Sequence, residues 1–227
     1  MPMKSLSPTS ANLHPERRSD GIPFSLLGPG TPLMKCVIAL CFCGLTIAAM
    51  AQSSYSSAKY GISFHYPRGY LLKEGALDNK DPGLSYFGPI PTMYAAPGGI
   101  RVVTIETPAG SYPGTDLNNA FFTASIHTNL TNAQCERFPE ELALAYRNVP
   151  AKEISGTLFH GIQIGEGGAG HQWGGKYYHG YSKGSCYEFG YGLATSGYGA
   201  VDGMKKVDEA AVFSILEKIL VSVKFHH

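Results

Sequence analysis

The sequence predicts an α+β protein in which a single antiparallel β-sheet carries a long C-terminal helix packed on it. Several segments alternate bulky apolar residues with small or polar ones, which is the period of a half-buried strand. The chain is rich in glycine (28) and tyrosine (14) and only 15% charged, which favours strands and turns over surface helices. One helical apolar pattern follows the strands near the end of the chain, and this order favours α+β over βαβ units.

The amino-terminal part of the chain has the pattern of a leader. Residues 1–33 are proline-rich and without periodicity, so we expect a disordered extension, or a start codon placed too early with Met34 as the true start. Residues 34–51 join a basic residue, an uncharged apolar run and small residues before Gln52, which is typical of a secretory signal peptide. An uncleaved signal-anchor is the alternative. We expect a polar linker at 52–58 and one domain at 59–227.

This leader predicts export to the periplasm or the extracellular space, with no membrane span after cleavage. The mature chain would keep two cysteines, Cys135 and Cys186, which predicts a disulfide; two buried free thiols are the alternative. Its net charge would be −1, with 14 basic and 15 acidic residues, once the leader is removed with Lys4, Arg17, Arg18, Lys35, Glu16 and Asp20. Without a basic excess, no nucleic-acid partner is predicted.

The first strands are read from alternation and β-branched residues. Tyr60, Ile62, Phe64 and Tyr66 alternate with small or polar residues, and 67–69 should end that strand. A short strand is expected at 70–72, and another at 84–87 within the irregular stretch 75–99. Residues 100–107 are rich in valine and isoleucine, which favours a central strand.

The second half of the chain predicts a β-meander and then a helix. Residues 121–128 favour a strand, Thr131 can cap a helical turn that carries Cys135, and 140–147 favours a helix. Glycine-containing turns separate four further segments, with Lys183-Gly184 as a hairpin tip; they are 152–154, 157–165, 170–181 and 186–195. Asp208 begins the clearest helix, whose apolar face is Val212, Ile215, Leu216 and Ile219, and a last strand is expected at 221–225.

The two ends of this domain resemble PsbP-like domains. The segment YGISFHYPRGY at 60–70 is similar to their first strand, and the helix followed by ILVSVKF at 219–225 is similar to their last helix and strand. The resemblance implies an antiparallel sheet between helices. It implies little about function, since photosynthetic members are extrinsic subunits of the oxygen-evolving complex, whereas bacterial relatives outside photosynthesis are mostly exported proteins of unknown role, and the photosynthetic role is not transferred to this chain. The glycine- and proline-rich segment and the two cysteines depart from the photosynthetic pattern.

Two segments match sequence motifs of catalytic or cofactor sites but lack the strand–turn–helix context that these motifs require. Residues 165–170 match G-x-G-x-x-G, but the following residues are a poor helix, so a glycine-rich β-turn is the better interpretation. Residues 180–184 match G-x-S-x-G, but a strand-like segment follows and only His226 and His227 lie beyond, so we expect a hairpin turn there. No catalytic residue is predicted.

Candidate binding residues lie in the expected meander. His160, His171 and His179 fall on neighbouring segments and could hold zinc or copper with a position left for water; hydrogen-bonded or surface histidines are the alternative. The aromatic residues Trp173, Tyr177 and Tyr181 could line a ligand groove or simply pack on the sheet.

The sequence therefore favours a non-enzymatic binding or accessory module that is exported and needs no cofactor, with an envelope protein as a candidate partner. The alternatives are a metal-assisted hydrolase that uses the histidine cluster, and a purely structural exported protein. The oligomeric state is not predicted.

Overall fold

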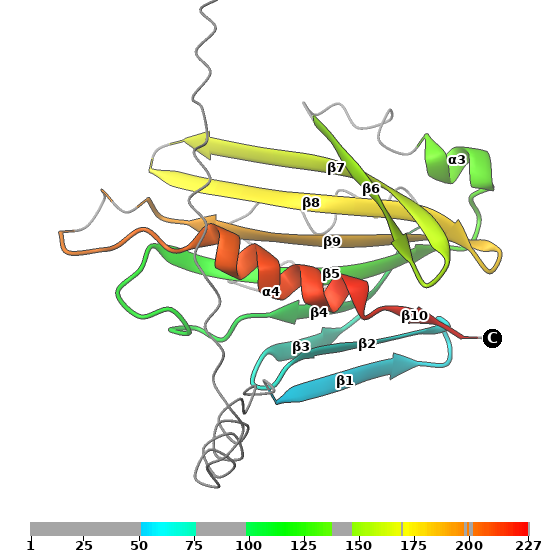
Figure 1. The fold of residues 1–227 in the computed structure, drawn as a ribbon, viewed down its shortest axis with the longest axis horizontal. Helices are drawn as coiled ribbons and strands as arrows, with labels where there is room; N and C mark the ends of the chain where they lie inside the picture. The colour runs from blue at the N-terminus through cyan, green and yellow to red at the C-terminus, as the bar shows by residue number, and fades with distance from the viewer. Residues whose placement is uncertain are drawn as a thin grey trace, which may run out of the picture. The chain divides into compact units, whose positions relative to one another are not determined.

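The computed structural model describes residues 51–75, 99–137, 147–168, 170–197, 199 and 202–226. Residues 49–227 form one compact unit. Within the described ranges, ten strands form two antiparallel sheets, and two helices, α3 and α4, accompany them (Figure 1). The antiparallel α+β prediction is confirmed, but the prediction of a single sheet is wrong.

The smaller sheet brings together both ends of the domain. It consists of β1 (Gln52–Ser57), β2 (Ile62–Pro67) and β10 (Lys224–Phe225), in the order β1-β2-β10. Residues 221–225 were expected to be a strand, of which only the last two residues are. Because β2 pairs with β1 on one side and with β10 on the other, these strands close a sheet of their own.

The expected linker at 52–58 is instead the edge strand β1. Its backbone pairs with β2 along its whole length, and the pairing places Tyr55 opposite Phe64. The two rings lie 5.1 Å apart, and Tyr55 is buried. One buried aromatic residue and the ladder of hydrogen bonds therefore hold a strand that is otherwise mostly serine, and strand structure is present from Gln52, ahead of the domain start expected at Lys59.

The larger sheet contains the predicted meander. Its order is β3-β4-β5-β9-β8-β7-β6, and its strands are β3 (Leu71–Glu74), β4 (Ile100–Glu106), β5 (Leu117–His127), β6 (Arg147–Ile154), β7 (Thr157–Gly168), β8 (His171–Ser182) and β9 (Ser185–Thr195). Lys183 and Gly184 form the tip of the β8–β9 hairpin with φ values of 49° and 80°, as the turn prediction requires.

Both predicted helix starts are confirmed. Helix α3 (Asn132–Glu136) is capped by Thr131, whose hydroxyl accepts a hydrogen bond from the backbone N–H of Gln134. Helix α4 (Glu209–Val221) is capped by Asp208, whose carboxylate accepts a hydrogen bond from the backbone N–H of Ala211 at 3.0 Å. The C-terminal helix was predicted to be long, but α4 has 13 residues and ends where Ser222 turns the chain into β10.

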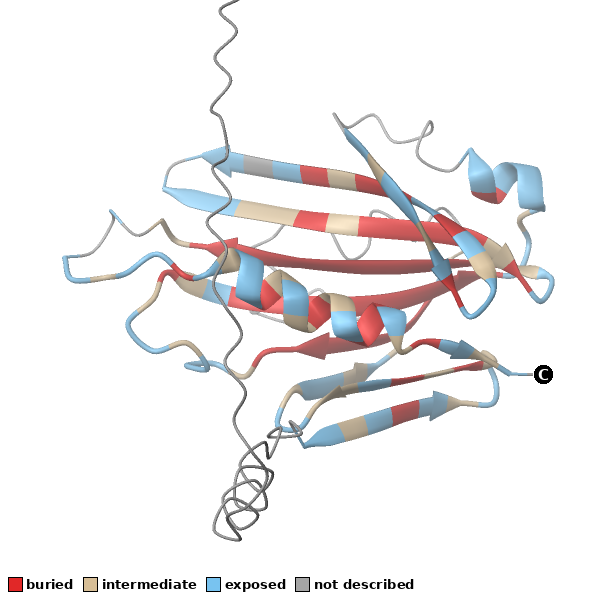
Figure 2. Ribbon diagram, viewed as in Figure 1, coloured by how far each residue is buried: buried red, intermediate tan, exposed pale blue. Residues whose placement is uncertain are grey.

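One face of the large sheet carries the main hydrophobic core. Helix α4 contacts β9, β5 and β2, so the helix and the small sheet cover the same face. Phe64 of β2 packs on Phe122 of β5 with ring centroids 5.2 Å apart, and Leu216 of α4 is fully buried in the same cluster. Figure 2 shows the buried residues concentrated on the central strands β4, β5 and β9.

Some sequence predictions fall outside the described residues. These are the leader at 1–50, the strand at 84–87 and the helix at 140–147, apart from Arg147, which begins β6. The backbone N–H of Arg68 donates to the carbonyl of Ala51 at 2.9 Å, so strand pairing reaches the predicted cleavage site. In the part of the chain that the structure describes, no helix has the length and apolar character needed to cross a membrane.

Candidate functional site

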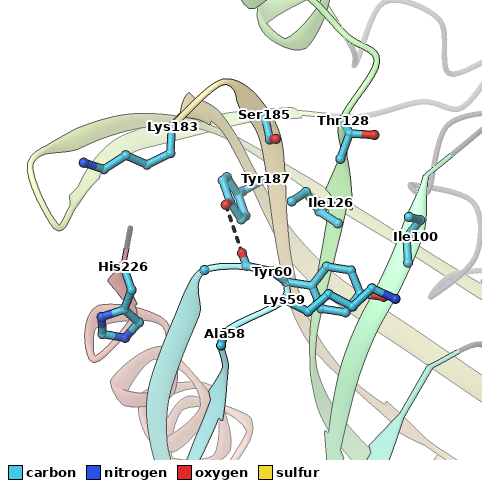
Figure 3. Close-up of a pocket in the computed structure, with 11 residues that line it drawn as sticks. Ala58, Lys59, Tyr60, Ile100, Ile126, Thr128, Lys183, Ser185, Tyr187 and His226 are labelled. Atoms are coloured by element: carbon cyan, nitrogen blue, oxygen red, sulfur yellow. Dashed lines mark hydrogen bonds between the residues drawn. The ribbon is translucent and has the colours of Figure 1, made fainter.

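A groove of about 690 Å³ lies at one end of the larger sheet (Figure 3). We call it the terminal groove. Its walls come from segments far apart in the sequence: residues 58–61 of the β1–β2 turn, Ile100, Ile126, Thr128, Lys183, Ser185, Tyr187 and His226.

A hydrogen bond across the groove fixes the β1–β2 turn against the large sheet. The hydroxyl of Tyr187 on β9 donates to the backbone carbonyl of Tyr60 at 3.0 Å, as Figure 3 shows. Burial raises the pKa of Tyr187, so this hydroxyl keeps its proton and remains a donor. Gly61 closes the turn at φ 64°, a conformation that favours glycine, and its carbonyl accepts from the backbone N–H of His226.

The groove combines an apolar surface with basic side chains. Ile100, Ile126, Tyr60 and Tyr187 supply the apolar surface. Lys59, Lys183 and His226 supply the basic groups, and none of the lining residues that the structure describes is an aspartate or a glutamate. The ring of His226 is held by a hydrogen bond of 2.6 Å between its Nε2 and the hydroxyl of Ser63. A second groove, of about 560 Å³ between β8 and α4, contains both signs of charge in Lys176, Lys218 and Glu217.

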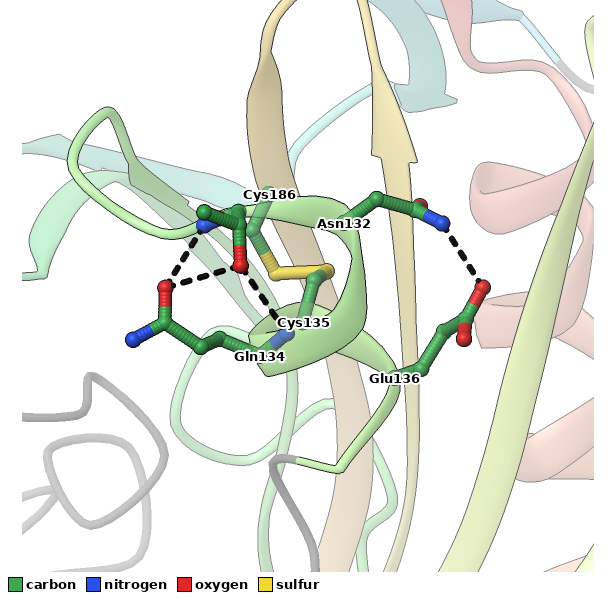
Figure 4. The surroundings of a disulfide bond; sticks show 6 residues. Asn132, Gln134, Cys135, Glu136 and Cys186 are labelled. Atoms are coloured by element: carbon green, nitrogen blue, oxygen red, sulfur yellow. Dashed lines mark hydrogen bonds between the residues drawn. A yellow bond between two sulfur atoms is a disulfide. The ribbon is translucent and has the colours of Figure 1, made fainter.

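The disulfide anchors the strand that contributes Tyr187 to the terminal groove, with Cys186 on the opposite face of β9 from that side chain. Cys135 of α3 is bonded to Cys186 of β9, with Cα atoms 5.6 Å apart, which confirms the predicted pair (Figure 4). Cys186 stands between Ser185 and Tyr187, two of the groove residues. The bridge therefore ties the start of β9 to α3, and so fixes the wall that Tyr187 contributes.

A row of polar residues crosses the opposite face of the large sheet. Direct cross-strand neighbours run from Arg101 on β4 through Ser125 on β5, Glu188 on β9 and His179 on β8 to His160 on β7. The first four are buried and His160 is exposed. Alternation along the strands places this row on the face away from α4, because their neighbours Ala124, Phe189 and Tyr178 belong to the main core.

Burial dominates the electrostatics of this row. It raises the pKa of Glu188 well above its usual range, and the nearby charge of Arg101 partly offsets that rise. It lowers the pKa of His179 to about 4, with a smaller contribution from His160. Nε and Nη1 of Arg101, Oγ of Ser125 and Oε2 of Glu188 are buried with no hydrogen-bond partner among the described residues.

The order of the row argues against a catalytic triad. A triad needs the histidine between the serine and the carboxylate, so that the imidazole can take the serine proton. Here Glu188 stands between Ser125 and His179. The row is therefore a set of buried polar side chains in which Ser125 has no neighbouring histidine to activate it as a nucleophile.

His179 gives the protein a testable dependence on acid. Its folded-state pKa lies below the ordinary 6.5, so its contribution to stability is complete above about pH 6.5 and is lost as pH falls toward 4. The full loss corresponds to about 3 kcal/mol. Glu188 acts in the opposite direction, because its raised pKa favours the folded state as pH falls.

We expect His179→Gln to reduce the stability lost between about pH 7.5 and about pH 4 by up to about 3 kcal/mol relative to the wild type. Urea denaturation at both pH values measures this. His171→Gln, on the same strand but exposed, is the matched control. Equal losses in His179→Gln and the wild type would show that the buried imidazole is not the acid-sensitive group.

The structure does not bring the three candidate metal ligands together. His160 and His179 are cross-strand neighbours with ring centroids 6.4 Å apart. His171 pairs with Gly168 at the other end of β8, roughly 26 Å along the strand from His179. Within the described ranges, no three histidine, cysteine, aspartate or glutamate residues are placed to hold a metal ion. The expectation that the three histidines lie together is therefore wrong, because only His160 and His179 are neighbours, and zinc or copper binding stays a prediction.

The three candidate aromatic residues share one face of β8 but do not line the terminal groove. Tyr177 is buried, and its ring lies where side chains on Gly175 and Gly190 would otherwise stand. Trp173 and Tyr181 are partly exposed on the same strand. Tyr177 thus packs on glycines of the sheet, and ligand binding by these three residues stays a prediction.

The two motif-like segments are hairpin turns, as expected. Residues 165–170 end β7 and lead directly into β8 rather than into a helix. Residues 180–184 end β8 and lead into β9. Neither segment has the strand–turn–helix context of a dinucleotide site or a nucleophile elbow.

No protein-family model and no curated protein matches the sequence. Among solved structures, the chain is similar to a protein from Bacteroides thetaiotaomicron, with a TM-score of 0.38 and 10% identity; the match covers 78% of this chain but 49% of that one, so the chain spans about half of its length.

Two further solved structures match over most of their own length. Cyanobacterial PsbP (CyanoP) from Synechocystis sp. PCC 6803 matches with a TM-score of 0.38 and 12% identity over 80% of this chain and 96% of that one. LpqN, involved in cell envelope biogenesis of Mycobacterium tuberculosis, matches with a TM-score of 0.44 and 11% identity over 78% and 91%. With TM-scores below 0.5, these similarities do not assign the chain to a family.

Proposed function

We propose that this protein is an exported, non-enzymatic binding or accessory module that holds its ligand in the terminal groove. The observation that carries the proposal is the lining of the groove, where, among the residues that the structure describes, an apolar surface meets the side chains of Lys59, Lys183 and His226. Specific ligand sites typically combine a mainly apolar surface with a few polar groups that fix orientation. The leader pattern and the Cys135–Cys186 bridge support export, since disulfides persist in oxidising compartments.

Capture from the native envelope tests the proposal. The processed wild-type protein is crosslinked in place, purified and analysed by mass spectrometry for bound proteins and small molecules. We expect a specific, stoichiometric binding partner or ligand to be captured with the wild type. The Lys59→Glu/Lys183→Glu variant should no longer capture it, because both lysines are exposed at the groove.

Lys205→Glu is the matched control, since Lys205 is exposed and bridges to Thr115 near the start of β5, at the other end of that strand from Ile126. If the double variant captures the same partner or ligand as the wild type, the binding site lies elsewhere on the protein. Turnover of a substrate by the pure processed protein would contradict the non-enzymatic role.

A further inference from the structure

Strand β1 is the outermost strand of the small sheet. The order β1-β2-β10 places β2 on one side of β1, and no other strand of the described residues pairs with its second side (Figure 1). The backbone N–H and C=O groups on such an edge can form hydrogen bonds with a strand of another chain. The free side of β1 is therefore a candidate surface for strand pairing.

Three residues of β1 direct their backbone groups toward this free side. The N–H of Arg68 donates to the carbonyl of Ala51, so the backbone groups of Ala51 face β2. Successive residues of an antiparallel strand bond to alternate sides. The N–H of His65 and the carbonyl of Gly61 fit this alternation, because both bond on the side of β10. The register therefore directs outward three residues that we call the β1 edge: Gln52, Ser54 and Ser56.

The other edge strands carry features that hinder pairing with a second chain. Strand β6 contains Pro150 and has an irregular register between Val149 and Lys152. Strand β3 has four residues, including Lys73 and Glu74, and β10 has two residues. Short length, proline, charge and irregular register all blunt an edge strand. Strand β1 has six residues in continuous register with β2 and contains no proline and no charged residue, so it has none of this protection.

The composition of β1 suits a second copy of the same strand. A two-fold axis perpendicular to the sheet places two copies of β1 side by side and antiparallel, with the same residues contributed by each. Like charges that stand opposite each other would destabilise such a pair, and β1 has no charge. The pairing would join two sheets of three strands into one sheet of six strands. Such a sheet lies within the usual range of about 4 to 6 strands.

We infer that the β1 edge pairs antiparallel with the β1 edge of a second copy of this chain, which makes the protein a dimer with two-fold symmetry. The partner is the chain itself, and recognition runs through backbone hydrogen bonds between the two edges. This inference is independent of the ligand proposed for the terminal groove.

Sedimentation equilibrium of the processed protein tests the inference, with a monomer–dimer equilibrium expected for the wild type. Ser54→Pro should raise the dimer dissociation constant about tenfold or more. It removes one outward N–H from each copy, and two such bonds together correspond to about 1.4 kcal/mol, which is tenfold. The ladder with β2 stays intact, because proline is tolerated on an edge strand where its nitrogen faces solvent. Ser56→Lys should also weaken the dimer, because it adds like charges across the axis.

Two control variants separate the edge from other effects. Ser54→Ala removes the hydrogen bond of 3.1 Å between the Ser54 hydroxyl and Nδ1 of His65 but keeps the outward N–H, so the dimer should persist. Leu158→Lys adds the same charge as Ser56→Lys at a position that is 56% exposed on β7, an inner strand, and should leave the dimer unchanged. Circular dichroism checks that every variant is folded; if Ser54→Pro does not fold, Ser56→Lys decides.

Hydrogen exchange locates the interface directly. We expect the amides of Ser54 and Ser56 to become protected as protein concentration rises, whereas the amide of Tyr55, which faces β2, should be protected at every concentration. A wild type that stays monomeric at the highest concentration reached would overturn the inference. A dimer that is equally stable in Ser54→Pro and Ser56→Lys would also overturn it, because its interface would then lie elsewhere.

Discussion

Replacing Glu188 with glutamine is expected to lower the free energy of unfolding at high pH, where the Glu188 carboxyl is ionised, because Arg101 then stays buried without that nearby counter-charge. A guanidinium does not release its proton in a protein, so titration cannot remove that charge. Glu106 also acts on Arg101 through its charge, but the Glu106 carboxylate is already bonded to Lys73 at 3.0 Å.

The reverse substitution, Arg101→Met, is expected to cost less than Glu188→Gln. Glu188 can take up a proton when its counter-charge is lost, since burial already raises its pKa well above the usual range. The double variant should be more stable than Glu188→Gln alone, because it leaves no buried charge without a partner.

Urea denaturation of the two single variants and the double variant measures this coupling as a double-mutant cycle. Glu153→Gln, at an exposed position on β6, should change stability by no more than about 0.5 kcal/mol and serves as the control. Strict additivity of the two substitutions would mean that Arg101 and Glu188 do not stabilise each other.

Removing the disulfide with Cys135→Ala/Cys186→Ala is expected to lower the free energy of unfolding by about 4 kcal/mol. The bridge closes a loop with a sequence separation of 51, for which the chain-entropy model gives that magnitude. Both cysteines are buried, so alanine avoids leaving a polar hydroxyl without a partner. Denaturation of this variant and of the reduced wild type should give similar losses.

The same variant should also loosen one wall of the terminal groove. Helix α3 has five residues, so its position depends on the bridge and on its contacts with β8 and β9. Hydrogen exchange should therefore rise first in α3 and at the start of β9, before the centre of the sheet. Two free thiols in the wild type isolated under oxidising conditions, seen as a mass gain of two hydrogens, would contradict the predicted bridge.

The sequence pattern was sufficient to predict strands with a clear apolar alternation or a high content of β-branched residues. Residues 60–66 alternate aromatic and small side chains, and 100–107 are mostly β-branched, so both gave recognisable strands. Strand β1 was not predicted because Tyr55 is its only large apolar residue. Its serines do not make one face of the strand more apolar than the other. Its partner β2, not its own composition, makes it a strand.

The functional features were harder to predict because they depend on register and on distant segments. The terminal groove joins residues from β4, β5, β9, two turns and the segment after β10, and no local spacing marks them. Glu188 could have been noticed, since Cys186, Glu188 and Gly190 alternate with the aromatic residues of β9. His171 and His179 both lie in the predicted segment 170–181, so their separation along one strand could have been read from the sequence, whereas the pairing of His160 with His179 needed the site of the β7–β8 turn.

The pairing of β10 with β2 has a consequence for how an exported chain would acquire its fold. Ser63 and His226 meet although they are separated by 163 positions. A chain that crosses a membrane with its amino terminus first can form the β1–β2 hairpin early, but α4 and β10 emerge last. Until then, the apolar side chains of Ile62 and Phe64 lack much of their covering, and such late, long-range closure makes folding slow. Until α4 and β10 arrive, the early β1–β2 hairpin of such a chain would therefore be exposed to aggregation.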